Sequence, residues 1–196
     1  NYAVDRELGG TIGMQAGSTF KVFTLAAALE KGFSLRERIS APSVKTFTGY
    51  KNCETGVSYP PYTVKNSTGS GTFDMATGTA LSVNTYFVEL QQRTGQCRPA
   101  EIAEALGVTT GKGTPLERVP SFTLGSQTVS PLSMAEAYAT FAARGLHCEG
   151  ATEAAAAEAE AARDDEHFEP PPVDLPPQED LHFWGAVIGL VAGPLM

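Results

Sequence analysis

The most informative stretch of this 196-residue sequence is residues 17–32, Gly17-Ser18-Thr19-Phe20-Lys21-Val22-Phe23-Thr24-Leu25-Ala26-Ala27-Ala28-Leu29-Glu30-Lys31-Gly32. The run of Ala and Leu favours a helix, Ser18 is of a residue type that often begins one, and Gly32 is typical of a helix end. A spacing of three places Ser18 and Lys21 on one face of that helix. The sequence therefore predicts a helix that carries a hydroxyl and an amine within reach of each other at its start.

This pair has the composition of an activated nucleophile. A serine hydroxyl needs a base beside it, and a lysine can be that base if burial and nearby positive charge keep its amine neutral. The helix N-terminus adds to this field, and its free N–H groups can face a developing oxyanion. By chance alone, however, Ser-x-x-Lys is expected about once in a chain of this length. A Ser at a helix start is also usually only a cap.

A second helix start adds to the signal. Apolar residues recur at spacings of three and four from residue 81 onward, at Leu81, Val83, Tyr86, Phe87 and Leu90. They predict a helix that ends at Gly95 and has Ser82 and Asn84 near its start. Such a hydroxyl could relay a proton to a leaving amine, and the amide could bind a peptide. In isolation, a capping Ser82 and a polar surface Asn84 would be the simpler interpretation.

The remaining patterns predict two further helices and a long loop. Pro99 to Leu106 predicts a short helix closed by Gly107. Ser130-Pro131 opens a fourth helix that runs to Gly145, with Ser at the cap and Pro at the first helical position. Residues 40–72 are rich in Pro, Gly, Thr, Ser and Asn and show no sustained period, so they predict a long, partly ordered loop region.

The charge is unevenly distributed. Residues 1–148 hold 13 Lys and Arg against 11 Asp and Glu, whereas residues 149–180 hold one Arg and 11 acids. The second segment is Ala/Glu-rich and then Pro-rich, which predicts a disordered tail. Residues 181–196 form a short apolar segment, shorter than the about 20 residues of a bilayer span. The sequence contains no signal peptide and no long apolar span, and no basic stripe indicates nucleic-acid binding.

The three cysteines are too far apart in the sequence for a metal knuckle or a redox pair; they are Cys53, Cys97 and Cys148. A Cys53–Cys97 disulfide with one thiol left over would suit an extracytoplasmic protein. Three free thiols are equally compatible with the spacing.

Other candidate residues are isolated in the sequence. Three histidines have no second ligand at metal spacing, namely His147, His167 and His182, so no metal site is predicted. Three single acids are expected to be solvated or capping rather than catalytic, namely Asp5, Asp74 and Glu89.

Taken together, Ser18-x-x-Lys21 and Ser82-x-Asn84 resemble two of the three motifs of the penicillin-recognising serine enzymes. The longer flanks, residues 17–32, 82–90 and 130–145, are similar to class A, bifunctional penicillin-binding proteins of actinobacterial type. The resemblance covers about residues 1–148. It implies the mostly helical portion of an α+β transpeptidase domain.

The resemblance also implies a reaction. Ser18 would be acylated by the D-alanyl-D-alanine end of a peptidoglycan stem peptide, and an amine from a second stem would resolve the acyl-enzyme. β-Lactams would mimic the first step. Lys21 would be the base for Ser18, while Ser82 and Asn84 would act on the leaving and incoming amines. No cofactor is implied.

The family further implies a location and partners. Its members act on the extracytoplasmic face of the bacterial membrane together with the cell-wall synthesis machinery. An upstream glycosyltransferase domain and an upstream membrane segment would precede the part seen here.

One departure from the family pattern is clear. No Lys-Thr-Gly or Lys-Ser-Gly occurs, and Gly111-Lys112-Gly113-Thr114 has the letters in another order and precedes the helix that the motif should follow. We predict a turn there. In the family the missing motif lies on a strand that binds the substrate carboxylate and completes the oxyanion hole. A truncated gene, a frameshift or a chimeric reading would explain the tail that follows Cys148.

Two other functions stay open at this level. A hydrolase of the same superfamily, a carboxypeptidase or β-lactamase, would need a deacylating water, and no Glu is recognisably placed to activate one. A non-catalytic binding module would keep the fold as a scaffold only.

Overall fold

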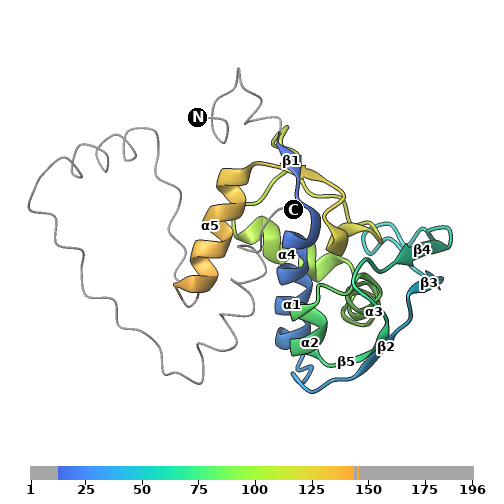
Figure 1. The fold of residues 1–196 in the computed structure, drawn as a ribbon. Helices are drawn as coiled ribbons and strands as arrows, with labels where there is room; N and C mark the ends of the chain where they lie inside the picture. Colours follow the sequence, from blue (N-terminus) through green and yellow to red (C-terminus); the bar gives the residue numbers. More distant parts are fainter. Residues whose placement is uncertain (1–12, 144, 146–196) are drawn as a thin grey trace, which may run out of the picture.

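The computed structural model describes residues 13–143 and 145. Its elements in chain order are β1 (Met14–Gln15), the 3-10 helix η1 (Gly17–Phe20), α1 (Lys21–Glu30), β2 (Ile39–Ala41), β3 (Val44–Phe47), β4 (Tyr62–Lys65), β5 (Gly71–Phe73), α2 (Met75–Ala80), α3 (Asn84–Thr94), α4 (Cys97–Ala105), η2 (Phe122–Leu124), β6 (Thr128–Val129) and α5 (Pro131–Ala142) (Figure 1). The strands form three antiparallel pairs, β1 with β6, β2 with β5 and β3 with β4. Helices and short antiparallel pairs together make the predicted α+β architecture.

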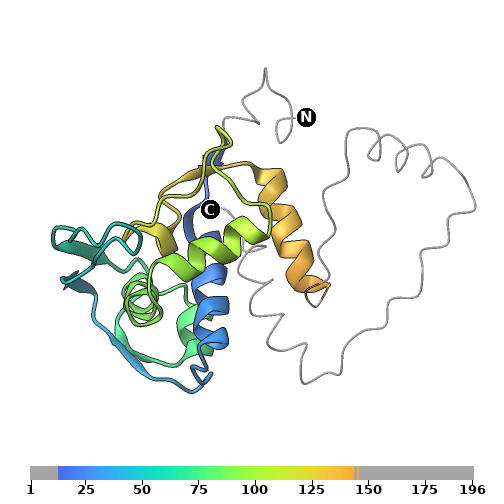
Figure 2. The ribbon, with the colours of Figure 1, turned by 180° about the vertical axis from the view of Figure 1, so that it is seen from behind.

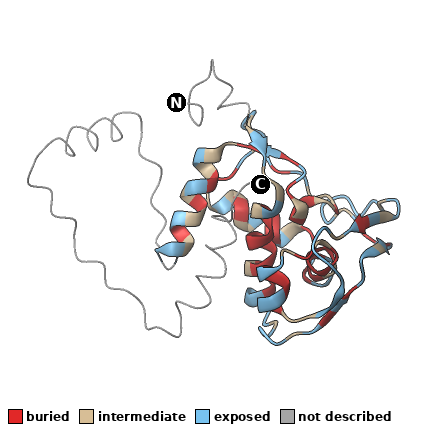
Figure 3. Ribbon diagram, viewed as in Figure 1, coloured by how far each residue is buried: buried red, intermediate tan, exposed pale blue. Residues whose placement is uncertain are grey.

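Helix α1 forms the centre of the core. Its buried residues occur on every turn, and Phe23 and Ala28 are completely inaccessible (Figure 3). Helices α3 and α4 pack directly against it, and α4 crosses it on the side seen in Figure 2. A helix that is apolar around most of its circumference is one that the rest of the domain encloses. The Ala and Leu run therefore specified both a helix and its central position.

Three of the four predicted helices keep their positions with shifted ends. The second helix begins at Asn84 rather than Leu81, and the third begins at Cys97, two residues before Pro99. The fourth begins as predicted, because Ser130 caps it by accepting a hydrogen bond from Leu132 N. It ends at Ala142, before Gly145.

The first predicted helix is divided in two. Residues 17–20 form the 3-10 turn η1, and the α-helix proper starts at Lys21. The short helix α2 was not predicted. Asp74 caps this helix, because its carboxylate accepts a hydrogen bond from Thr77 N at 2.8 Å. A capping role was one of the two roles predicted for Asp74.

The prediction of a loop over residues 40–72 is wrong. This region contains β2, β3, β4 and β5, each three or four residues long. The alternation that identifies a strand needs four to eight residues, so strands this short leave no readable period. Their partners also lie far away in sequence, as in the pair Ile39 and Phe73.

The β3–β4 hairpin is fixed to the helical core. Phe47 and Val64 are buried on its inner side, and Tyr50 OH donates to Val88 O of α3 at 2.6 Å. Glu89 of the same helix accepts from Lys45 of β3 at 2.6 Å and from Arg93 at 3.1 Å. Glu89 is thus part of a half-buried ion-pair network. The prediction that it is solvated or a cap is wrong.

A disulfide settles the cysteine alternatives for two of the three residues. Cys53, in the loop between β3 and β4, is bonded to Cys97, the first residue of α4, with their Cα atoms 5.9 Å apart. The third cysteine, the three histidines, Asp5 and the segments 149–180 and 181–196 lie outside the described residues.

The Gly111–Thr114 stretch is a turn, as predicted. Gly113 N donates to Thr110 O at 2.8 Å and Thr110 N donates to Thr114 O at 3.1 Å. The Lys112 side chain makes no hydrogen bond or ion pair with the described part of the chain.

Candidate active site

Ser18 lies in η1, three residues before Lys21, the first residue of α1. The turn begins after Ala16 without any side-chain cap, so the interpretation of Ser18 as a capping residue is wrong. Its side chain is exposed, and among residues 13–143 it has no hydrogen-bond partner. The Ser18 hydroxyl is therefore exposed and unbonded within this part of the chain.

A backbone-to-backbone contact holds this turn from one side. Gly17 N donates to Gly125 O at 3.0 Å, just after η2. A Cβ atom on Gly125 would lie 2.1 Å from Gly17 O, and Gly125 itself has φ of +62°. Only glycine fits both the space and the left-handed backbone here. Phe20 and Phe122 pack beside this contact with ring centroids 5.0 Å apart.

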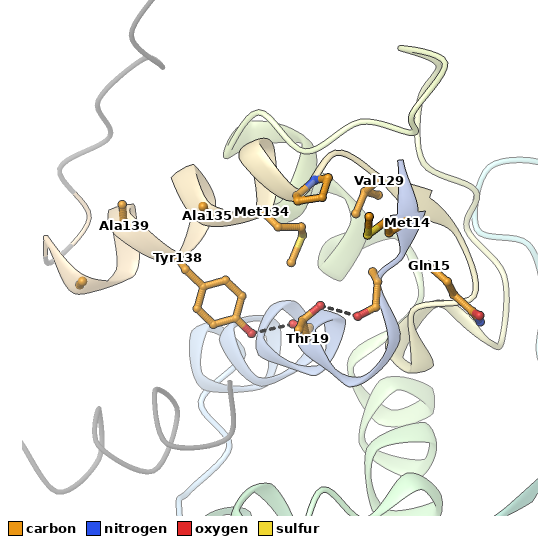
Figure 4. Close-up of a pocket in the computed structure, with 11 residues that line it drawn as sticks. Met14, Gln15, Thr19, Val129, Met134, Ala135, Tyr138 and Ala139 are labelled. Carbon is orange, nitrogen blue, oxygen red and sulfur yellow. Dashed lines mark hydrogen bonds between the residues drawn. The ribbon is translucent and has the colours of Figure 1, made fainter. Parts of the chain in front are cut away.

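Helix α5 holds the same turn from the other side. Tyr138 OH donates to Thr19 O at 2.8 Å, and Thr19 Oγ1 donates to Ala16 O at 2.6 Å (Figure 4). Burial raises the pKa of the Tyr138 phenol, so it stays a neutral donor at physiological pH. Both residues that flank Ser18 in sequence are thus fixed, which orients the hydroxyl between them.

Lys21 turns its amine away from the surface and toward the start of α3. Its side chain is buried, and Nζ donates to Ser82 O at 2.7 Å, to Ser82 Oγ at 2.8 Å and to Asn84 Oδ1 at 2.8 Å. Three acceptors match the three donors of an ammonium group. The amine also lies over the face of the Phe87 ring, with the ring centroid 5.4 Å from Nζ.

Burial lowers the pKa of Lys21 from its ordinary value of 10.5 to about 7. The physical cause is desolvation, because the charged form loses more hydration than the neutral form when it is buried. A pKa near neutrality lets one amine both accept and return a proton at physiological pH. Burial therefore shifts the pKa of Lys21 in the expected direction, and its role as a base stays a prediction.

The Ser82 turn connects α2 to α3 through an unusual backbone. Ser82 has φ of +50°, and it is the only non-glycine residue with a positive φ in the described part of the chain. Val83 N donates to Gly78 O at 3.0 Å, and a Cβ on Gly78 would lie 2.9 Å from the Tyr86 ring. A left-handed serine costs about 1–2 kcal/mol relative to the right-handed region. This conformation presents both the carbonyl and the hydroxyl of Ser82 to Lys21.

Asn84 is held at both ends of its amide. Its Oδ1 accepts from Lys21, and its Nδ2 donates to Lys65 O at 3.0 Å, at the end of β4. As the first residue of α3, it follows Val83, which provides no side-chain cap. Neither Ser82 nor Asn84 is therefore a simple cap or a free surface residue.

The structure thus gathers Lys21, Ser82 and Asn84 into one hydrogen-bonded cluster. Ser18 is placed next to this cluster along the turn but is not bonded to Lys21. Sequence reasoning missed the groups that orient these side chains, namely Gly125, Tyr138 and the Lys65 carbonyl. Backbone carbonyls leave no signal in a sequence, and Gly125 is one glycine among the 20 in the chain.

A groove of about 590 Å³ lies between α5 and the turn that carries Ser18 (Figure 4). Its walls come from β1, η1, β6 and α5, and they are mostly apolar, with Met14, Val129, Met134 and Ala135 among them. Thr19 lines it, whereas neither Ser18 nor Lys21 does. The groove therefore borders the turn of residues 17–20 and does not contain Ser18 or Lys21.

The described residues contain neither a membrane-spanning helix nor a cluster of metal-ligating side chains. None of their helices has both the length and the apolar character needed to cross a membrane. Likewise, in this part of the chain no three His, Cys, Asp or Glu side chains gather where they could hold a metal ion.

Comparison with known proteins identifies the family of this chain. Residues 10–178 match the family described as the penicillin binding protein transpeptidase domain. The chain belongs to this family. The match extends past residue 148, into the segment predicted to be a tail.

The transpeptidase domain has relatives among mycobacterial proteins. It is 32% identical over 149 residues to penicillin-binding protein 1A of Mycobacterium tuberculosis, which covers 69% of this chain and 17% of the relative. The chain is also 32% identical over 151 residues to penicillin-binding protein 1A of Mycolicibacterium smegmatis, again over 69% of this chain and 17% of the relative. The predicted resemblance to class A proteins of actinobacterial type is confirmed. The chain spans only about a sixth of the length of these relatives.

Solved structures of penicillin-binding proteins are similar to this chain in fold. The penicillin-binding protein PonA1 from Mycobacterium tuberculosis superimposes with a TM-score of 0.52 at 30% identity, over 69% of this chain and 35% of that chain. Penicillin-binding protein A from the same organism, in a ceftriaxone acyl-enzyme complex, superimposes with a TM-score of 0.52 at 25% identity. This match covers 69% of this chain and 34% of that chain. The α+β transpeptidase fold class is confirmed.

Proposed function

We propose that this domain binds penicillin and cross-links peptidoglycan stem peptides as a D,D-transpeptidase through an acyl-enzyme on Ser18. The observation that carries the proposal is the Lys21 cluster. A buried amine with a pKa near 7, held by Ser82 and Asn84, lies one turn from an exposed and unbonded serine hydroxyl. Acyl-enzyme complexes of the M. tuberculosis relative penicillin-binding protein A support the same chemistry.

The first half-reaction forms an ester. Ser18 Oγ attacks the carbonyl carbon between the two D-alanines, and its proton passes to the neutral Lys21 amine. Free N–H groups at the start of the helix stabilise the oxyanion that forms. The tetrahedral intermediate collapses as the C–N bond breaks, and the leaving D-alanine amine takes a proton. Ser82 Oγ, 2.8 Å from Lys21 Nζ, is placed to relay that proton.

The second half-reaction returns the enzyme to its starting state. An amine of a second stem peptide loses a proton through Ser82 to Lys21 and attacks the ester carbonyl. The C–O bond to Ser18 breaks, and Ser18 recovers its proton from Lys21. Asn84 keeps Lys21 and Ser82 in register during both steps, since its amide bonds Lys21 at one end and Lys65 O at the other.

The same proposal places the site outside the cytoplasm. The Cys53–Cys97 disulfide is a type of bond that persists in oxidising compartments. The curated relatives are penicillin-binding proteins, which fits action on the cell wall. Stem peptides that end in D-alanyl-D-alanine are the proposed substrates and β-lactams the proposed inhibitors.

A labelling experiment tests the proposal. The chain is extended at its C-terminus by strands that carry a Lys-Thr-Gly motif, incubated with fluorescent penicillin and digested for mass spectrometry. We expect one adduct, on the peptide that contains Ser18, and no adduct in Ser18→Ala. Ser70→Ala is the matched control, because Ser70 is also an exposed serine but lies in the β4–β5 loop. An unchanged adduct in Ser18→Ala would refute the proposal.

The same assay separates the alternatives. Rapid loss of the adduct with turnover of a chromogenic cephalosporin would indicate a hydrolase, and binding without any covalent mass gain would indicate a scaffold. For the 196-residue chain without extension we expect no stable adduct. Clear labelling of that chain would show that the Lys-Thr-Gly strand is dispensable for acylation.

A further inference from the structure

The N-terminus of α3 needs a capping group that its own sequence does not provide. The first N–H groups of a helix have no partner within the helix. The residue at the cap position is Val83, which has no side-chain oxygen and makes no capping bond. Because Asn84 is the first residue of this helix, the missing cap lies directly at the Lys21 cluster.

Asn66, from the end of β4, supplies that cap. Its Oδ1 accepts from Thr85 N at 2.8 Å, and its Nδ2 donates to Pro42 O at 3.1 Å and to Gly69 O at 2.8 Å. Every polar atom of this side chain is therefore engaged. One end closes the helix, and the other ties it to two loop segments.

The neighbouring contacts converge on the same place. Lys65, next to Asn66, accepts from Asn84 Nδ2 through its carbonyl, so residues 65 and 66 bind residues 84 and 85 in parallel. Thr85 Oγ1 also donates to Pro42 O at 3.0 Å. The link between β2 and β3, the end of β4 and the start of α3 thus meet at one hydrogen-bonded junction.

We propose that Asn66 is a positioning residue of the active site, which holds the start of α3 and the end of β4 so that Asn84 and Ser82 face Lys21. The inference rests on the proposed function for its catalytic meaning. Asn66 does not touch Lys21; it acts through Thr85 and through the Lys65 carbonyl.

Removal of the Asn66 amide has a defined structural consequence. In Asn66→Ala, Thr85 N loses its cap, and the end of β4 loses its ties to Pro42 and Gly69. The Lys65 carbonyl then keeps only the backbone ties of the β3–β4 pair, namely the pairing of Lys65 with Val44 and the bond from Asn66 N to Ser43 O at 2.8 Å, so it holds the Asn84 amide less firmly. Lys21 consequently has one less firmly held acceptor and becomes more accessible to reagents.

Asn52 offers a matched control. Its Oδ1 accepts from Glu54 N and Thr55 N at 2.9 Å each, and its Nδ2 donates to Tyr59 OH at 3.0 Å. Asn52 thus organises a loop in the same way, but within the described residues its side chain makes no hydrogen bond with α3 or Lys21. Asn52→Ala measures the effect of loop loosening alone.

The first test uses the 196-residue chain itself and requires no activity. Lys21 is acetylated with acetic anhydride under native conditions, and its modification rate is followed by mass spectrometry of its peptide. We expect a rate about tenfold higher in Asn66→Ala and within about twofold of the parent in Asn52→Ala. Asn66→Asp keeps the acceptor for Thr85 N but loses the donor to the Pro42 and Gly69 carbonyls, so its acetylation rate should lie between those of the parent and Asn66→Ala. Equal rates in Asn66→Ala and Asn52→Ala would overturn the proposal.

The second test uses the extended, penicillin-binding form. Asn66→Ala should lower the acylation rate constant about tenfold to a hundredfold and change the dissociation constant for penicillin less than about twofold. Asn52→Ala should change neither. Unchanged acylation in Asn66→Ala would overturn the catalytic part of the inference. If the parent itself is not acylated at Ser18, the proposed function fails instead, and the Lys21 acetylation rates alone decide whether Asn66 positions the cluster.

Discussion

The two turns that meet at Lys21 are built in opposite ways. The turn of residues 17–20 puts its positive φ on Gly17, and its contact Gly125 is also a glycine. The turn of residues 81–83 puts its positive φ on Ser82, which carries a side chain. Glycine adopts this backbone without penalty, whereas serine does not. The difference indicates that the second turn needs the hydroxyl and the left-handed backbone at the same residue.

The two turns also differ in their relation to Lys21. The lysine follows the first turn, three residues after Ser18, yet its amine donates to Ser82 in the second turn and to Asn84 directly after it. The first turn exposes the Ser18 hydroxyl, and the second holds the amine of Lys21, the proposed base. We therefore expect substitutions in the first turn to act through steric packing. Substitutions in the second turn should act through the loss of groups that bond Lys21.

The largest effect should come from removal of the proposed base, Lys21. Lys21→Met retains an unbranched apolar stem, so the domain should fold, but the acylation rate of the extended form should fall at least about a thousandfold. Lys45→Met is the control, since the Lys45 amine also lies over a ring, that of Phe47, but it bonds Glu89 rather than Ser82 or Asn84. The rate constant with fluorescent penicillin measures both. Similar rates in the two variants would contradict the assignment of Lys21.

The next effect tests the fit of the first turn. Gly125→Ala places a Cβ against Gly17 O and should lower the free energy of unfolding by about 4 kcal/mol. Gly107→Ala is the control, because its φ is also positive, +79°, but nothing lies within 4 Å of the added Cβ. It should cost only about 1 kcal/mol. Urea unfolding of both variants would show whether the steric contact or the backbone angle dominates.

The pH dependence of stability tests the buried amine. The folded-state pKa of Lys21, about 7, lies below the ordinary value of 10.5, so the unfolded chain binds more protons between these values. The free energy of unfolding should therefore rise with pH across this window, by about 2 kcal/mol from pH 7 to pH 9 from this group alone. Lys21→Met should lack this component. An identical pH profile in parent and variant would show that the amine is not desolvated.

The smallest effect concerns the strained serine. Ser82→Gly and Ser82→Ala both remove the hydroxyl that accepts from Lys21, but only glycine relieves the positive φ. The glycine variant should be more stable than the alanine variant by about 1 kcal/mol, while both lose most of their acylation rate. Thermal unfolding and penicillin labelling together check this. Equal stability of the two variants would remove the argument for strain at Ser82.

Much of the site could be identified from the sequence because its motifs are local. Ser18 and Lys21 are three residues apart, and Ser82 and Asn84 are two apart, so short spacings and helix signals were sufficient to name them. The strands of residues 39–73 were missed because each is short and pairs with a distant segment. The Asn66 cap and the Tyr138 bond to Thr19 O were invisible for the same reason.

The sequence by itself determined the central apolar helix, the four motif residues and the family to which they belong. These depend on residue type and on spacing along the chain. Only the tertiary structure decided that the Lys21 amine binds Ser82 and Asn84 rather than Ser18, and that Cys53 pairs with Cys97. Hydrogen bonds and disulfides between distant segments depend on how the core packs, and no local pattern encodes that.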